Sequence, residues 1–299
     1  MGCLRLEVLV LLQLGHASSS KNRGGFTGKW HSISPMSNPP VTVTSSGHER
    51  LAKVMARREM CSRREAERMI GAGQVEVDGV IIAEQGVKVR LDAVIKINRI
   101  GQQWIDGKVT ILVHKPVGIV SNQPEEDQVP AWKLLTAESL HGAGDPAQVE
   151  RVLKDPYYLN VAGRLDRDSC GLLVMTTDGL LIKRITGGRS LDKIYHVVCD
   201  QPVEQLQLVA LNRRMVLDGE QLLPMQVTRL KDGPDHLRFV LREGRNRQIR
   251  RCCEQVDLRV KSLLRIAIGP WSLADLPQGK WRLITPTERA AIDEEPATG

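Results

Sequence analysis

The chain has 299 residues, of which 41% are hydrophobic and 26% charged, and its net charge is +7. These values fit a globular protein with one sizeable domain and a smaller one, and the absence of any run of about 18 apolar residues excludes a membrane span. The positive charge is concentrated, because nine Lys or Arg stand against three acidic residues from Arg238 to Arg265. This cluster favours a polyanionic partner over a merely solvated basic face.

The six cysteines indicate a reducing compartment and no metal site. They show no Cys-x-x-Cys spacing, and His196 with Cys199 lacks the second pair of ligands that zinc needs. Cys252 and Cys253 are neighbours on a predicted helix, where we expect them to fill core space as small apolar groups.

The amino-terminal lead, residues 1–48, has two interpretations. An apolar run from Val8 to Leu14, followed by a basic stretch without acidic residues, is typical of an export or organelle signal. However, Glu7 directly precedes the run, and Met36 begins a polar stretch that suits the start of a soluble protein. We favour a mis-assigned start codon, with residues 1–35 absent or disordered and the protein cytoplasmic; a transit peptide to a mitochondrion or plastid is the alternative.

Residues 49–97 are predicted to form a small domain of two helices and a hairpin. Apolar residues from Leu51 to Met55 have helical spacing, and Ser62-Arg63-Arg64-Glu65 is a capping box that begins a second helix, which ends at Gly71. Asp78-Gly79 between Val75-Glu76-Val77 and Val80-Ile81-Ile82 is a strong hairpin signal. Five arginines on or beside the helices are candidate RNA-phosphate ligands, with a solvated face as the alternative: Arg57, Arg58, Arg63, Arg64 and Arg68.

A linker is expected at 98–108, a second domain at 109–290 and a disordered tail at 291–299. Strands are predicted at 110–113, 172–177, 195–199, 225–230 and 236–241, and helices at 132–140, 203–212 and 246–255. Strands dominate without regular βαβ alternation, which predicts an α+β fold with a mixed, largely antiparallel sheet.

The most informative segment is the nonapeptide Gly163-Arg164-Leu165-Asp166-Arg167-Asp168-Ser169-Cys170-Gly171. It places Asp166 between two arginines on a loop just before a predicted buried strand, and Asp178-Gly179 is predicted to form a turn after that strand. Positive neighbours favour the charged form of a carboxylate, and the same guanidinium groups can bind phosphates. A surface salt bridge on a turn is the alternative interpretation.

Together with three further segments in the right order, this nonapeptide resembles the catalytic motif of the pseudouridine synthases, and most closely the RsuA/RluB/RluE/RluF-like branch. The three segments are Lys115-Pro116-Val117-Gly118-Ile119, Lys193-Ile194-Tyr195-His196-Val197 and Glu243 to Arg251. Residues 49–97 resemble the S4-type RNA-binding domain. The segment from Leu276 to Thr285 resembles members that modify large-subunit (23S-type) ribosomal RNA.

The resemblance implies a monomeric enzyme that isomerises uridine to pseudouridine in ribosomal RNA or ribosome-assembly intermediates, without metal, nucleotide or other cofactor. It implies Asp166 as the catalytic residue, Tyr195 stacked on the flipped uracil, and Arg250 as the basic partner of Asp166, with Arg247 as the fallback. It also implies that Arg164 fills the gap left by the flipped base and that Leu263 packs under that base. Further candidate RNA ligands are Arg245, Arg247 and Arg251.

Two other functions remain open on the sequence. A non-catalytic RNA-binding ribosome-assembly factor would keep the basic surfaces but would not need a carboxylate that faces RNA phosphates. Hydrolysis of the glycosidic bond would need a second positioned carboxylate, for which Asp168 is the near candidate.

Overall fold

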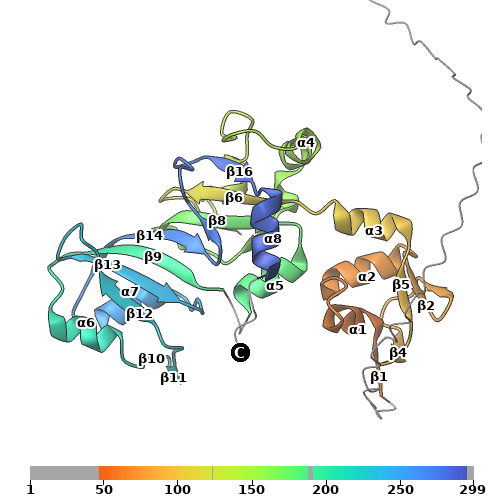
Figure 1. Ribbon diagram of the computed structural model, residues 1–299, viewed down its shortest axis with the longest axis horizontal. Coiled ribbons are helices and arrows are strands. Elements are labelled where there is room, and N and C mark those ends of the chain that lie inside the picture. The colour runs from red at the N-terminus through yellow and green to blue at the C-terminus, as the bar shows by residue number, and fades with distance from the viewer. Residues whose placement is uncertain (1–46, 123, 188–190, 295–299) are drawn as a thin grey trace, which may run out of the picture. The chain divides into compact units, whose positions relative to one another are not determined.

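The computed structural model describes residues 47–122, 124–187 and 191–294, and the predicted lead before residue 47 lies outside them. The first part of the described chain forms the predicted helices and hairpin (Figure 1). Its elements are β1 (His48–Arg50), α1 (Leu51–Arg57), α2 (Arg63–Gly71), β2 (Val75–Val77), β3 (Val80–Ile82), β4 (Lys88–Arg90) and β5 (Ile95–Ile97). Ser62 and Glu65 form the predicted capping box, and Asp78 and Gly79 both have positive φ, as a tight hairpin turn requires.

A helix occupies the segment predicted as a linker. It is α3 (Arg99–Asp106), and Asn98 caps it by accepting a hydrogen bond from the Gly101 amide. Trp104 and Ile105 of α3 pack against the apolar core of the first domain. The segment therefore adds a third helix to that domain.

A nine-stranded sheet organises the rest of the chain. Its order is β12-β13-β9-β14-β8-β6-β16, with β15 paired to β14 and β7 to β8. The pair β14–β8 is parallel and the other pairs are antiparallel, which confirms the predicted α+β class. The strands are β6 (Thr110–Lys115), β7 (Asn160–Ala162), β8 (Cys170–Thr176), β9 (Lys193–Cys199), β12 (Gln226–Arg229), β13 (His236–Leu241), β14 (Val260–Ile268), β15 (Trp271–Ser272) and β16 (Trp281–Leu283), and a separate hairpin joins β10 (Val216–Leu217) to β11 (Glu220–Gln221).

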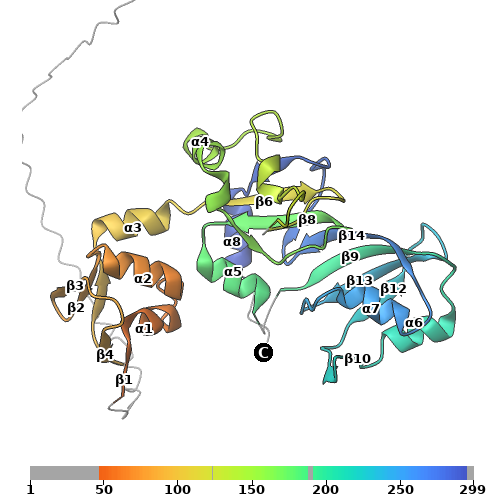
Figure 2. The same cartoon turned by 180° about the vertical axis from the view of Figure 1, so that it is seen from behind.

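Both faces of this sheet are covered by apolar cores. Leu172 and Val174 of β8 contribute to the core that includes residues of α5 and α8, and Leu173 and Met175 contribute to the core that includes a residue of α4. The helices are α4 (Pro146–Lys154), α5 (Gly179–Thr186), α6 (Gln205–Leu211), α7 (Gln248–Glu254) and α8 (Pro286–Glu294), with 3-10 turns at Ala131–Leu134 and Pro156–Tyr158. Figures 1 and 2 both show α5 and α8 side by side.

The predicted helix at 132–140 is wrong. A short 3-10 turn ends at Leu134, and the helix of this region is α4, which Asp145 caps and Pro146 begins. Thr136 and Ser139 hydrogen-bond each other's backbone amides, and such side-chain bonds offer the backbone an alternative to helix.

Two further boundaries differ from expectation. The Asp178-Gly179 pair does not form a simple turn, because Asp178 caps α5 through the Leu180 and Leu181 amides. At the carboxyl end, α8 continues to Glu294 and buries Ile292 completely, so residues 291–294, which were expected in the tail, belong to this helix.

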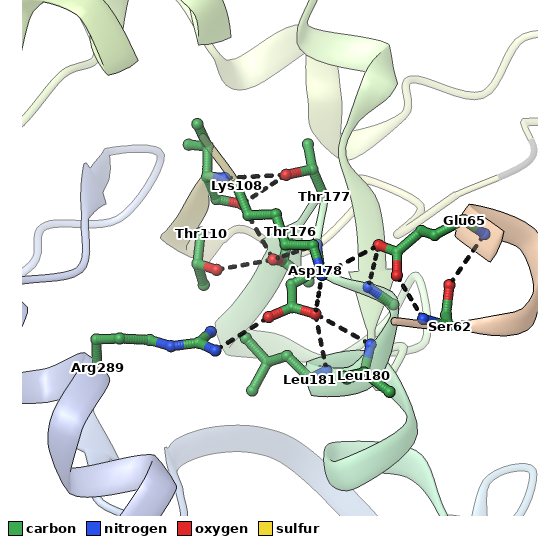
Figure 3. Close-up of polar contacts among 12 residues, drawn as sticks. Ser62, Glu65, Lys108, Thr110, Thr176, Thr177, Asp178, Leu180, Leu181 and Arg289 are labelled. Carbon is green, nitrogen blue, oxygen red and sulfur yellow. Dashed lines mark hydrogen bonds and ion pairs between the residues drawn. The ribbon is translucent and has the colours of Figure 1, made fainter. Parts of the chain in front are cut away.

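The capping box of α2 also contacts the larger domain (Figure 3). Glu65 is 2% exposed; its Oε2 accepts from the Ser62 amide at 2.6 Å and its Oε1 accepts from the Gly179 amide at 3.0 Å. Lys108 lies 3.5 Å from Glu65 and 3.1 Å from Asp178. A Cβ on Gly179 would lie 2.3 Å from Ser62 Oγ, so this close approach, rather than a turn, requires glycine. One carboxylate thus serves the amino ends of both α2 and α5.

We expect Glu65→Ala to destabilise the protein by about 1–3 kcal/mol, because buried amide donors lose their acceptor. Thermal denaturation and limited proteolysis between residues 98 and 108 would measure the effect. The matched control is Glu67→Ala on the same helix, which removes an exposed ion pair with Arg63 at 3.4 Å and should cost about 0–1 kcal/mol. Equal melting temperatures for the two variants would contradict this role of Glu65.

Candidate active site

Asp166 lies on the loop between β7 and β8, and the backbone of this loop is fixed from outside. The Ser121 hydroxyl donates to the Leu165 carbonyl at 2.6 Å and accepts from the Leu165 amide at 2.9 Å. The Gly118 amide donates to the Arg167 carbonyl at 2.8 Å. The loop after β6 therefore holds both neighbours of Asp166, whose own carboxylate is 36% exposed.

Arg265 of β14 also holds this loop, and it is almost completely buried, with 1% of its surface exposed. Its guanidinium donates to the carbonyls of Gly163 at 2.8 Å, Arg164 at 3.3 Å and Leu172 at 2.7 Å. Gly171 allows the backbones of β8 and β14 to pair closely at Arg265, because a Cβ there would overlap the Arg265 carbonyl group. Arg265 was assigned no role from the sequence; the signal was a lone arginine between the apolar pairs Leu263-Leu264 and Ile266-Ala267.

One cavity brings together the residues that the family resemblance singled out. It has a volume of about 80 Å³, and the predicted residues that line it are Arg164, Asp166, Tyr195, Arg245, Arg247, Arg250 and Leu263. Tyr195 is 7% exposed and pairs across the sheet with Phe239 on one side and Arg265 on the other. The arrangement places an aromatic ring, an aliphatic side chain and a carboxylate around one small space.

Arg247 and Arg250 contact the loop at other residues than the family resemblance implies. Arg247, the fallback, is the arginine that pairs with Asp166, at 4.0 Å. Arg250 is buried and donates to the backbone carbonyls of Asp168 at 2.9 Å and Val260 at 3.1 Å. Its Nε also lies 3.3 Å from the Asp168 carboxylate. Arg250 therefore contacts Asp168, two residues after Asp166, in place of the expected contact with Asp166.

Asp168 is held as a carboxylate by these arginines. Partial burial raises its pKa, but the two hydrogen bonds from Arg247, at 2.9 and 3.2 Å, and the charge of Arg250 outweigh burial and leave the pKa below its usual value. Both carboxylate oxygens are therefore engaged with guanidinium groups, which argues against Asp168 as a second acid in a hydrolysis reaction.

Two buried lysines, Lys115 and Lys193, lie near the charged residues of this region. Lys115 is fully buried, donates to the carbonyls of Pro116 at 2.8 Å and Ile119 at 2.7 Å, and has its pKa lowered by burial to about 8. Burial, with the nearby charge of Arg265, likewise lowers the pKa of Lys193 to about 8. Lys115 fixes the turn that carries Gly118, and so supports the loop of Asp166 indirectly.

The arginines proposed as RNA ligands fall into three groups. Arg58 donates to the carbonyls of Leu91 and Ala93, at 2.6 and 2.8 Å, so the structure gives it a folding role in the first domain. Others form exposed ion pairs that a phosphate could replace: Arg57 with Glu49, Arg63 with Glu67, Arg245 with Glu220 and Arg251 with Asp218. Arg64, Arg68 and Arg164 are exposed, and Arg68 stacks on Trp104 at 5.1 Å.

Comparisons with known proteins agree with this geometry. The RNA pseudouridylate synthase family matches residues 109–255, and the S4 domain family matches residues 49–95. The dual-specificity RNA pseudouridine synthase RluF of Escherichia coli strain K12 is 32% identical over 242 residues, which are 80% of this chain and 76% of that protein. The chain belongs to the RNA pseudouridine synthase family. It is an isomerase of the RsuA/RluF type with an S4 domain.

Two other relatives match about four fifths of this chain. An RNA pseudouridine synthase of Rickettsia conorii is 32% identical over 79% of this chain and 96% of its own length. The ribosomal small subunit pseudouridine synthase A of Pseudomonas aeruginosa is 28% identical over 81% of this chain and all of its own. A crystal structure of a pseudouridylate synthase superposes on 81% of this chain, and on 99% of that one, with a TM-score of 0.55 and 25% identity. Within the described ranges, none of the helices is long and apolar enough to cross a membrane.

We expect Arg265→Met to slow isomerisation far more than it weakens RNA binding, because Arg265 touches the catalytic loop and not the cavity. Three carbonyls would lose their donor, and misplacement of the loop by about 1 Å can cost about 100-fold in rate. Arg265→Lys should recover part of the rate, since a lysine can reach one of these carbonyls. Single-turnover rates and RNA affinities, measured separately, would show the split.

The matched control for Arg265 is Arg259→Met, an exposed arginine just before the same strand. It should leave the single-turnover rate unchanged. If Arg265→Met lowered only the melting temperature and kept the rate, Arg265 would be a folding residue alone.

Proposed function

We propose that this synthase acts on ribosomal RNA and that its target lies in the large subunit. The name of the Pseudomonas aeruginosa relative supports ribosomal RNA as the substrate class. The segment from Leu276 to Thr285, which resembles large-subunit enzymes, carries the choice of subunit. In the structure this segment contains the edge strand β16, whose Trp281 is buried. The segment therefore supports the choice of subunit through its resemblance to large-subunit enzymes, and we assign it no contact with RNA.

In the proposed mechanism, Asp166 is the group that reacts with the target nucleotide. The base is detached from its ribose, turned within the site and rejoined through carbon, so the atoms of the uridine are conserved. Tyr195 stacks on the uracil, Leu263 packs against it and Arg247 orients the Asp166 carboxylate, as their places around one cavity support. Water must be kept from the detached base, and Tyr195, Leu241 and Leu263 supply the apolar part of a lining that is otherwise largely polar.

Arg164 is proposed to take the place of the extruded nucleotide in the RNA stack. A uridine inside folded RNA has to leave its neighbours before a side chain can reach its glycosidic bond. The Arg164 side chain is exposed at the cavity, while its backbone carbonyl is held by Arg265. An exposed cation on a fixed loop can enter the RNA while the loop keeps its position relative to Asp166.

Mapping pseudouridines in ribosomal RNA from cells with and without this protein tests the proposal. We expect one or a few sites in large-subunit RNA to revert to uridine when the protein is absent. Sites confined to small-subunit RNA would contradict the choice of subunit, and sites confined to transfer RNA would contradict the substrate class. Re-expression of the unaltered protein, but not of Asp166→Ala, should restore the modification.

A further inference from the structure

A second cavity, distinct from the one around Asp166, lies where α3, α4 and the 3-10 turn Pro156–Tyr158 meet the start of β6. Its volume is about 400 Å³, and none of the residues that line it belongs to the cavity of Asp166. This volume lies in the range of sites that hold a small molecule or a single nucleotide, about 300–1,000 Å³. The mechanism proposed above makes no use of it.

Two aromatic rings line this cavity in a chain with three tyrosines and five tryptophans. Tyr158 is 59% exposed, which leaves a large ring surface in water. Trp104 is half-buried, because α3 packs it against the core of the first domain, and its ring also carries the guanidinium of Arg68 at 5.1 Å. One ring is thus fixed by packing and the other is open to a ligand that can stack.

Cationic side chains stand beside the rings. Arg151 and Lys154 come from the last turn of α4 and are exposed, and both line the cavity. Arg151 is held in place by donating to the Gly107 carbonyl at 2.5 Å. Aromatic faces with adjacent Lys and Arg are the features that single-stranded nucleic acid requires, since bases stack and phosphates seek positive charge.

Asp155 supplies the carboxylate of the lining, which also includes Thr177. A carboxylate repels phosphate, but it accepts hydrogen bonds from an exocyclic amino group of a base, as acidic side chains do with cytosine. Cytosine, adenine and guanine carry such a group and uracil does not. The lining therefore favours a base other than uracil.

The position of the cavity relative to the catalytic loop fits the same RNA molecule. Thr177, which lines the cavity, directly follows β8, and β8 begins at Cys170 just after the catalytic loop. Its seven residues, at about 3.3 Å each, separate the two places by roughly 20 Å. A folded RNA whose target uridine occupies the cavity of Asp166 can therefore place a nucleotide of a neighbouring loop or strand in the second cavity.

We propose that this cavity binds one unpaired, amino-bearing nucleotide of the substrate RNA outside the target uridine, with its base on Tyr158 and Trp104 and its phosphate beside Arg151 and Lys154. The site selects the RNA rather than performing chemistry. The proposal depends on RNA as the substrate and not on which ribosomal subunit supplies it.

The test uses the full-length protein and unmodified ribosomal RNA transcripts of both subunits. Tyr158→Ala should weaken RNA binding by about 5- to 150-fold, the equivalent of one lost base stack, and Tyr158→Phe should bind as the unaltered protein does. The rate at saturating RNA should stay the same in both variants, because Tyr158 does not line the cavity of Asp166. Leu206→Ala, which removes an apolar side chain 79% exposed on α6, is the control and should bind normally.

Two further arms identify the ligand. Lys154→Ala should reduce the salt dependence of RNA binding, and cytidine monophosphate alone should compete only weakly. Tight binding of cytidine monophosphate to the unaltered protein, with RNA affinity unchanged in Tyr158→Ala, would show a metabolite site and overturn the proposal. Unchanged RNA affinity in Tyr158→Ala without such nucleotide binding would overturn it as well. If the unaltered protein formed no pseudouridine in either ribosomal RNA, the proposed function would be contradicted. The RNA affinities of the Tyr158 variants could still be compared.

Discussion

Asp166→Ala is expected to abolish pseudouridine formation, with a loss of about 10⁴-fold or more, the scale seen when an enzyme loses a residue that acts directly on the reacting bond. RNA affinity should be unchanged or slightly higher, because the substitution removes a negative charge from a surface that faces phosphates. Release of the uridine hydrogen at carbon 5, measured in single-turnover experiments together with the dissociation constant, would separate the two quantities.

Asp166→Asn provides the matched control for shape, because it keeps the size of the side chain and loses its charge and nucleophilicity. It should be as inactive as the alanine variant. The loop should keep its structure in both, since Ser121, Arg265 and Arg250 hold its backbone through atoms other than the Asp166 carboxylate. Activity within about tenfold of the unaltered protein would reject the assignment and reopen the interpretation of the chain as an RNA-binding assembly factor.

Substitutions at Tyr195 are expected to separate stacking from chemistry. Tyr195→Ala should weaken RNA binding by about 1–3 kcal/mol, the contribution of one stacked base, whereas Tyr195→Phe keeps the ring and should bind normally. If the hydroxyl transfers or positions a proton at the base, Tyr195→Phe should also lose turnover, because proton transfer requires a group within hydrogen-bond reach. Single-turnover rates and affinities for the three proteins would distinguish these roles.

Tyr195 is largely buried, so loss of packing has to be measured separately. Phe239→Leu is the control, because Phe239 is the fully buried cross-strand neighbour of Tyr195 and does not line the cavity. It should lower the melting temperature and leave RNA affinity unchanged. Identical binding and rates for the tyrosine, phenylalanine and alanine proteins would show that position 195 serves the core only.

Local signals predicted most of the first domain. The capping box at Ser62 and Glu65 and the Asp78-Gly79 turn were found from the sequence because their chemistry is complete within four residues. The β-strand at residues 236–241 was likewise predicted with the bounds observed, since its alternation of apolar and polar residues reflects one buried face. Where a short segment contains its own partners, the sequence is sufficient.

Contacts between distant segments account for what the sequence did not show. The role of Arg265 depends on carbonyls about a hundred residues earlier, at Gly163 and Arg164, and no local pattern records that approach. Arg250 was expected at Asp166 because its motif marks it as a partner of the loop, but the fold aims it at Asp168. Gly179 was taken for a turn residue, since the nearness of Ser62 is visible only in three dimensions.

The dual use of Glu65 limits how the two domains can be exchanged between related enzymes. A chimera that joins the first domain of one synthase to the catalytic domain of another takes residues 65 and 179 from different parent proteins. Position 179 has no room for a side chain beside Ser62, and the Glu65 carboxylate accepts from the amide of residue 179. Such a hybrid would therefore lose the contact between the two domains although its chain is continuous. Chimeras intended to change RNA choice should therefore take Ser62, Glu65, Lys108 and Gly179 from one parent.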